Sequence, residues 1–184
     1  IRNSTMIIDS LGDPELAMRR LDPVLELMKD SVHKFGGIVN KVQGDGIMAL
    51  FGAPRAYEDH AVRGCLAALA MQDAAAKLPD SSLGIRVGLH TGEVVVQTVE
   101  NSIYQTYDAA GVHVHLASRM EQSAEEGTIL ISETTYAAAR QFIEAICLGP
   151  FSLKGIAAPV EGYTLLGTRH APSSEIFRVG QLSP

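Results

Sequence analysis

Apolar residues at helical spacing predict a long helix near the start of the chain. Asp13-Pro14-Glu15 combines a carboxylate N-cap with proline at the first helical position, which is typical of a helix start. Beyond it, apolar side chains recur every three or four residues, at Leu21, Val24, Leu25, Met28, Val32 and Phe35. Gly36-Gly37 ends this helix, and residues 4–11 are predicted to form a shorter one before it.

Short apolar runs predict two hairpins separated by a helix. The four predicted strands are residues 38–42, 47–51, 85–90 and 93–98. The first pair flanks Gln43-Gly44-Asp45-Gly46, a tight acidic turn, and the second flanks Thr91-Gly92. Between the hairpins, residues 59–78 are rich in Ala, Leu and Met and predict a helix.

The second half of the chain alternates helices with strands. Helices are predicted over 112–123 and after Ser132, and strands over 128–131, 146–153 and 160–166. Residues 168–184 show no periodicity and are expected to form a tail or linker. This order of elements predicts an α+β sandwich, in which helices pack on a mainly antiparallel sheet.

Composition narrows the functional classes. The chain has 184 residues, of which 46% are hydrophobic and 20% charged, so it suits a folded domain and not a disordered chain. A net charge of −6 argues against nucleic acid and anionic membranes as partners. Cys65 and Cys147 form no CxxC pattern, which argues against a disulfide framework or a zinc site and favours a reducing, cytoplasmic location.

No apolar run reaches the ~18 residues of a spanning helix, and no signal peptide is visible. The chain opens with Ile1 and not with Met, so we expect a piece of a longer protein.

Several segments carry residues that could do chemistry. Asp45 lies in KVQGDGIMALFG, although Asp-Gly alone is ordinary turn chemistry. In YDAAGVHVHLASRM, His115 and Arg119 are four apart and share a helix face, with Asp108 just before the helix start. Such a face could hold a phosphate or simply be solvated. His113 and His115 point in different directions on a helix, which argues against a metal pair.

Two further segments contain cations. In IRVGLHTGEVVV, Arg86 and His90 share one strand face by the period of two, which also fits a half-buried strand with a polar edge. Lys154 follows in GPFSLKG and means little alone.

In order and spacing, these segments resemble the class III nucleotide cyclases, the adenylyl and guanylyl cyclase catalytic domains. The resemblance covers residues 1–167 and rests on QGDGIMALFGAP, RVGLHTGEVV, the stretch from YD to ASRM, and GPFSLKG. It implies a ferredoxin-like βαββαβ core with extra C-terminal strands and a helix, working as a head-to-tail homodimer. It also implies attack of a ribose 3′-oxygen on the α-phosphate of a nucleoside triphosphate, with release of pyrophosphate.

The resemblance implies two Mg²⁺ or Mn²⁺ ions per site, held by carboxylates. Asp45 matches the second of the family's two metal aspartates. The first would be the residue directly before Ile1, and Ile1 would offer its backbone carbonyl. Asn3, Ser4 and Thr5 would bind phosphate through N–H groups at a helix start.

In the family resemblance, two positions indicate which nucleotide base the substrate carries. Lys41 stands where lysine goes with adenine and glutamate with guanine, and Asp108 matches the acceptor of the adenine amino hydrogen. A lysine donor and a carboxylate acceptor suit adenine, so ATP is the expected substrate.

The remaining positions concern the transition state. Arg119 matches the family's transition-state arginine, and Arg86 and Lys154 match its triphosphate-binding cations. His115 stands where the family has an asparagine that orients the ribose and α-phosphate. Imidazole is bulkier than an amide and titrates near neutral pH, so this departure bears on activity and not on fold.

Two functions of different classes remain. In the first, residues 1–167 form an adenylyl cyclase domain that makes cyclic AMP from ATP. In the second, a cyclase-homology module with weak or no turnover binds nucleotide or dimerises to regulate attached domains, which His115 and the missing first aspartate favour. A guanylyl cyclase is a third possibility, against which Lys41 argues.

Overall fold

The computed structural model describes residues 1, 6, 9, 12–79, 83–100, 105–153 and 159–169, with the backbone alone at 14, 97–100 and 105–108. The predicted long helix is present as α2 (Pro14–Lys34). Its N-cap Asp13 accepts hydrogen bonds from the backbone N–H groups of Glu15 at 2.8 Å and Leu16 at 3.4 Å. Of the helix predicted over residues 4–11, Met6 and Asp9 are described, and both are helical. Most of the predicted tail, residues 170–184, lies outside the described residues.

The first predicted hairpin is confirmed. Strands β1 (Ile38–Gln43) and β2 (Gly46–Leu50) pair antiparallel around the two-residue turn Gly44-Asp45. Gly44 has a φ of +58°, a left-handed conformation in which glycine has no Cβ to clash. The turn therefore places the Asp45 carboxylate at the end of the hairpin.

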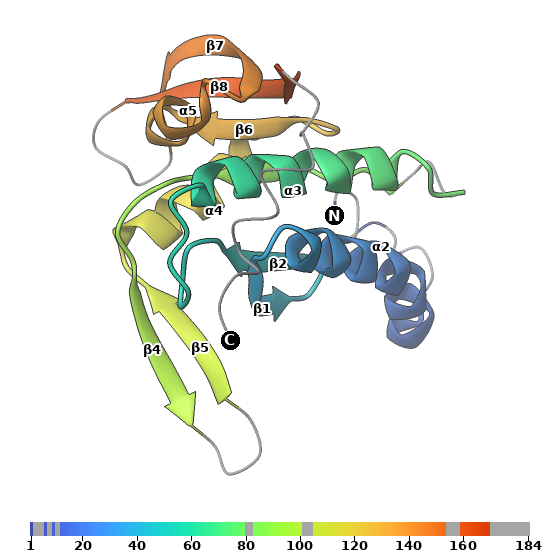
Figure 1. Ribbon diagram of the computed structural model, residues 1–184. Helices are drawn as coiled ribbons and strands as arrows, with labels where there is room; N and C mark the ends of the chain where they lie inside the picture. Colours follow the sequence, from blue (N-terminus) through green and yellow to red (C-terminus); the bar gives the residue numbers. More distant parts are fainter. Residues whose placement is uncertain are drawn as a thin grey trace.

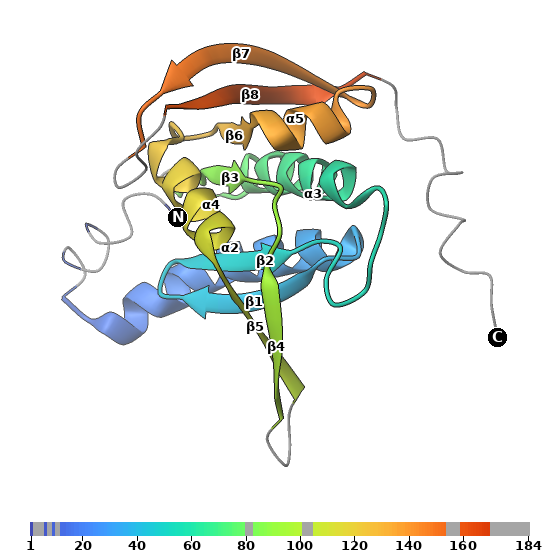
Figure 2. The same ribbon diagram turned by 90° about the vertical axis from the view of Figure 1, so that its left-hand side faces the viewer.

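A four-stranded mixed sheet forms a second layer (Figures 1 and 2). Its strand order is β3 (Val87–Leu89), β6 (Ile129–Ser132), β8 (Val160–Thr168) and β7 (Ile143–Phe151). β3 and β6 are parallel, and the other neighbours are antiparallel. Helix α3 (His60–Ala75) lies between this sheet and the layer formed by α2, β1 and β2, and α5 (Glu133–Ala139) follows β6.

The second predicted hairpin is wrong. Residues 90–94 form no regular structure, and the strands on either side of them take different partners. β3 pairs with β6, whereas β4 (Val95–Glu100) pairs antiparallel with β5 (Gln105–Ala110), where the sequence predicts no strand. The β4–β5 hairpin projects away from the rest of the molecule (Figures 1 and 2). Local pattern predicts that a segment is extended, but tertiary contacts decide which strand it pairs with.

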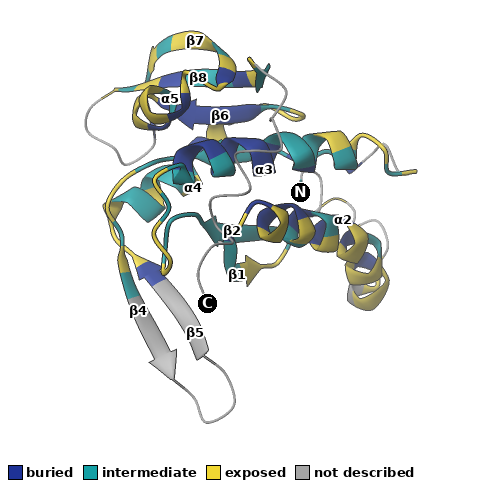
Figure 3. Ribbon diagram, in the orientation of Figure 1, coloured by how far each residue is buried: buried dark blue, intermediate teal, exposed yellow. Residues whose placement is uncertain are grey.

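Helix α4 (Val112–Ser123), which has the predicted bounds, follows β5 and packs on β3 and β6. β6 is buried along its whole length and anchors two of the three apolar clusters, one toward α3 and one toward α4 (Figure 3). The third cluster lies between α2 and residues of β2, α3 and β3. Within the described ranges, no helix combines the length and the apolar character that crossing a membrane requires.

Candidate active site

A cleft of about 720 Å³ opens between the two layers. It is bordered by the β1–β2 turn, β2, α3, β3 and α4. Asp45 and Arg86 both line it, and so does Ile1. The fold therefore brings a carboxylate and a guanidinium from distant segments of the sequence to one cavity.

Asp45 and Ile1 lie next to each other in this cleft. The Ile1 nitrogen donates to the backbone carbonyl of Asp45 at 2.8 Å and lies 3.6 Å from its Oδ2. The Asp45 side chain is 41% exposed, and carboxylate oxygen is the ligand type that Mg²⁺ and Mn²⁺ prefer. Within the part of the chain that is described, no three His, Cys, Asp or Glu side chains gather into a complete metal site. Asp45 therefore offers an oxygen ligand that a divalent cation could use, whereas Ile1 contacts Asp45 through its nitrogen, a hydrogen-bond donor and not a metal ligand.

One face of the segment from Arg86 to Gly92 packs against one stripe of α4. Arg86 Nε donates to Glu121 Oε1 at 2.6 Å. At Gly88, a Cβ would collide with the backbone nitrogen of Glu121, and at Gly92 it would collide with the His113 ring. The two glycines therefore let the strand and the helix approach more closely than any side chain would allow.

His90 connects three elements. Its Nδ1 lies 2.9 Å from Ser132 Oγ at the junction of β6 and α5, and its Nε2 lies 2.8 Å from His113 Nδ1 in α4. The two imidazole rings stack with their centroids 5.0 Å apart. Burial, followed by the charge of His113, lowers the pKa of His90 to about 4, so this side chain is neutral at neutral pH. Arg86 and His90 flank β3 instead of lying within it, and both contact α4, so they lie on the same side of this segment, as predicted.

His115 and Arg119 lie one turn apart on α4, as predicted. His115 is exposed, and Arg119 Nη1 donates to Gln122 Oε1 at 2.8 Å. Gln122 lines the cleft, whereas His115 and Arg119 do not. Arg119 therefore stands at the edge of the cleft rather than inside it.

Of the two residues predicted to read the base, the structure describes the side chain of one, Lys41, and it lies outside this cleft. Lys41 lies opposite Met48 in the β1–β2 register and is not a lining residue. The backbone of Asp108 pairs with Gln97 in the β4–β5 hairpin, and its side chain lies outside the described part. The predicted phosphate-binding residues Asn3, Ser4, Thr5 and Lys154 also lie outside the described residues.

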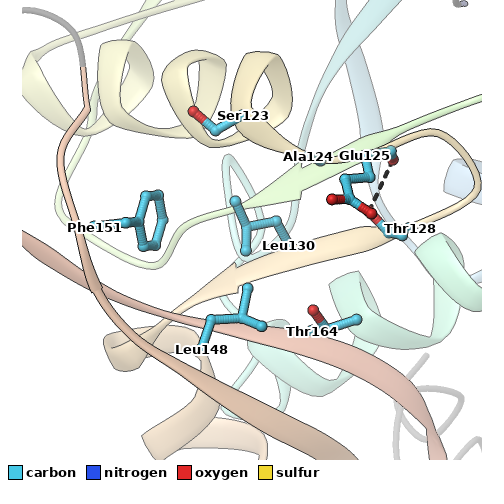
Figure 4. A pocket seen from close by; sticks show the side chains of 8 residues that line it. All are labelled: Ser123, Ala124, Glu125, Thr128, Leu130, Leu148, Phe151 and Thr164. Carbon is cyan, nitrogen blue, oxygen red and sulfur yellow. Dashed lines mark hydrogen bonds between the residues drawn. The ribbon is translucent and has the colours of Figure 1, made fainter.

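A second, smaller cavity of about 310 Å³ contains none of the predicted site residues. Its lining comes from the end of α4, the following loop and the strands β6 to β8: Ser123, Ala124, Glu125, Thr128, Leu130, Leu148, Phe151 and Thr164 (Figure 4). Half of these lining residues are polar, and one of them, Thr128, donates its hydroxyl to the backbone carbonyl of Glu125 at 2.8 Å. The predicted site residues that line a cavity, Ile1, Asp45 and Arg86, all lie in the larger cleft.

Three residues were not expected in these contacts from any motif: Glu121, which binds the predicted site residue Arg86, and His113 and Ser132, which contact His90. A pattern that could identify the first two is present in the sequence. Residues 86, 88, 90 and 92 follow the strand period of two, and residues 113, 117 and 121 follow the helical period of four. No sequence pattern singles out Ser132 as a partner of His90, because that contact depends on the parallel pairing of β3 with β6.

The chain belongs to the adenylate and guanylate cyclase catalytic domain family, whose model matches residues 1–167. Its fold is similar to that of the adenylyl cyclase CyaB from P. aeruginosa, with a TM-score of 0.79 and 29% identity over 92% of this chain and 91% of that one. It is equally similar to the guanylyl cyclase Cya2, with a TM-score of 0.77 and 30% identity over 95% and 91%. These likenesses confirm the predicted α+β nucleotide cyclase fold.

Two bacterial adenylate cyclases are among the sequence relatives of this chain. Adenylate cyclase 1 of Rhizobium meliloti is 29% identical over 169 residues, which are 86% of this chain and 25% of that protein. An adenylate cyclase of Mycobacterium tuberculosis is 33% identical over 144 residues, which are 72% of this chain and 32% of that protein. The chain therefore spans about a quarter to a third of the length of these curated relatives.

Proposed function

We propose that this domain converts ATP to 3′,5′-cyclic AMP and pyrophosphate at sites formed between two copies of the chain. The observation that carries the proposal is the position of Asp45 and Arg86 in one cleft, where a carboxylate suits divalent cations and a guanidinium suits phosphate. In the reaction, the ribose 3′-oxygen bonds to the α-phosphorus, and the bond from that phosphorus to pyrophosphate breaks. The hydroxyl proton leaves to solvent.

Asp45 through its carboxylate, and Ile1 through its backbone carbonyl, would hold Mg²⁺ or Mn²⁺, with two ions per site as the family resemblance implies. When bound, these ions would favour ionisation of the 3′-hydroxyl and neutralise triphosphate charge. Because Glu121 engages Nε of Arg86, the terminal nitrogens of that guanidinium can donate to a phosphate. Asn3, Ser4, Thr5 and Lys154 would add phosphate contacts.

A homodimer would complete the site. His115, Arg119 and Lys41 do not line the cleft that holds Asp45, so a single chain does not gather these groups in one cavity. A second copy packed head to tail would bring the exposed face of α4 to the cleft of the first. His115 would then orient the ribose and the α-phosphate, and Arg119 would stabilise transition-state charge.

Adenine is the proposed base. Lys41 would donate to a ring nitrogen, and Asp108 would accept from the exocyclic amine, a pairing that mismatches the carbonyl and N–H of guanine. The relatives include both adenylyl and guanylyl cyclases at about the same identity, so this preference rests on these two residues.

The test is an assay of the full-length protein, as its gene encodes it, with ATP and with GTP in the presence of Mg²⁺ or Mn²⁺. We expect cyclic AMP, and we expect Asp45→Asn to abolish it while the protein stays folded, because a turn tolerates Asn. Asp73→Asn, an exposed change on α3, is the matched control. Activity that survives Asp45→Asn would remove Asp45 from the mechanism, and a preference for GTP would overturn the assigned base.

A second candidate function is a regulatory module that dimerises or binds nucleotide without turnover. His115, which replaces the family asparagine, favours it. If the domain is an active cyclase with His115 as a stand-in, His115→Asn preserves or raises kcat. A tenfold loss, about 1.4 kcal/mol, would give the imidazole a role of its own. No product from either nucleotide in a dimeric protein would favour the regulatory module.

A further inference from the structure

The contact between the 86–92 segment and α4 is polar at both ends and close-packed in the middle. At its centre, a Cβ on Gly88 would also collide with the backbone carbonyl of Ala117. At one end stands the Arg86–Glu121 ion pair, and at the other the His90–His113 contact. Two side-chain contacts, two turns apart along α4, therefore fix the orientation of this helix relative to the 86–92 segment.

His113 lies at the N-terminal end of α4, and this end depends on tertiary contacts for its stability. Gly111, the N-cap residue of α4, provides no side-chain hydrogen bond to the free N–H groups of the first turn. The backbone N–H groups of a first helical turn have no partner within the helix, and glycine supplies no capping side chain, so tertiary contacts contribute to fixing this turn. His113 is the second residue of α4, and its ring is hydrogen-bonded and stacked on His90.

His90 is itself fixed from the other side. Its Nδ1 lies within hydrogen-bond distance of Ser132 Oγ, and Ser132 is only 2% exposed, at the end of the fully buried β6. Ser132 also hydrogen-bonds Thr135 and Thr134 through their hydroxyl groups. The His90 imidazole therefore bridges the core strand β6 and the first turn of α4, and it fixes the position of that turn relative to the strand.

We infer that His90 is a positioning residue for the cyclase reaction: by holding His113, it sets the first turn of α4 and, through it, His115 two residues further on. This inference rests on the proposed function, because His115 and Arg119 act on the nucleotide only if the domain turns it over. His90 does not touch the substrate in this scheme. It acts through the orientation of the helix that carries these two residues.

Substitutions at His90 can distinguish the roles of its two ring nitrogens, Nδ1 and Nε2. Gln places an amide near the position of Nε2 and can keep the contact with His113, whereas Asn reaches only toward Ser132. Phe keeps the ring but neither hydrogen bond. His33→Asn, an exposed change on α2, is the control. All variants are made in the full-length protein, and kcat and KM for ATP are measured together with amide hydrogen exchange of residues 112–116.

The inference expects His90→Gln to keep kcat within about threefold, and His90→Asn and His90→Phe to lower it about tenfold or more, with KM little changed. Exchange at 112–116 should rise in the same order. Equal kcat for the Gln and Asn variants, or a rise in KM at constant kcat, would overturn it. A wild-type protein that makes no cyclic nucleotide overturns the proposed function, whereas exchange at 112–116 that is unchanged in all three variants overturns the role of His90 alone.

Discussion

β3 and β6 lie side by side as parallel strands of one sheet, yet they serve the molecule differently. All four residues of β6 are buried, and Ile131 at its centre has no exposed surface. The three residues of β3 are half-buried, and the segment around it carries Arg86 and His90 at the cleft. The inner strand, which has sheet neighbours on both sides, supports the core, whereas the edge strand presents polar groups to the cavity.

This difference explains why polar side chains lie beside β3 and not along β6. A strand buried on both faces is mostly apolar, because each buried polar group needs a partner, as Ser132 has in His90 and Thr135. An edge strand beside a cleft can carry charged side chains and still contribute one apolar face to the core. The polar residues of the 86–92 segment are accordingly used for contacts with α4, and glycines occupy the positions where α4 comes closest.

The largest effect is expected from a cavity beside β6, which tests directly whether this strand supports the core. Ile131→Ala removes a fully buried side chain, so we expect the free energy of unfolding to fall by about 2–5 kcal/mol in urea denaturation. Ile146→Ala is the control, because Ile146 is 55% exposed on β7 and should cost less than about 0.5 kcal/mol. Equal losses for the two variants would contradict the assignment of β6 as the supporting strand.

A smaller effect is expected on the β3 side. Gly88→Ala adds a methyl group that collides with the backbone of α4, so we expect a loss of about 1–3 kcal/mol in the free energy of unfolding. Gly167→Ala in β8 is the matched control, because a Cβ there meets no atom within 4 Å. A Gly88→Ala protein as stable as the control would mean that α4 can move away from β3 at no cost.

The smallest expected effect is the pH dependence that His90 confers. Its pKa is about 4 in the folded chain and ~6.5 when unfolded, so the unfolded chain binds more protons between these values. The contribution of His90 to stability is therefore complete above pH ~6.5 and is lost as the pH falls toward about 4. We expect wild type to lose more stability than His90→Gln between pH 7 and pH 4.5 in urea denaturation. A difference between the two proteins that does not vary with pH would contradict this.

Much of the fold could be predicted from local pattern. The long α2 helix and its Asp13 cap, the β1–β2 hairpin and the bounds of α4 all follow from periodicity and turn chemistry over short stretches. The pairing of residues 85–98 could not be predicted. Thr91-Gly92 looks like a hairpin turn, but β3 gains a buried parallel neighbour in β6, and β4 finds β5 instead.

The candidate site divides in the same way. The sequence by itself determined the residue types and their local geometry: a carboxylate in a tight turn at Asp45, and two polar side chains one helical turn apart at His115 and Arg119. These depend on neighbours within a few positions, where backbone geometry decides the outcome. Only the tertiary structure decided that Asp45 and Arg86 line one cleft, that Glu121 holds Arg86, and that His90 bridges Ser132 and His113. Those contacts join residues far apart in the chain, and their partners are chosen by how the layers pack and not by any spacing along the sequence.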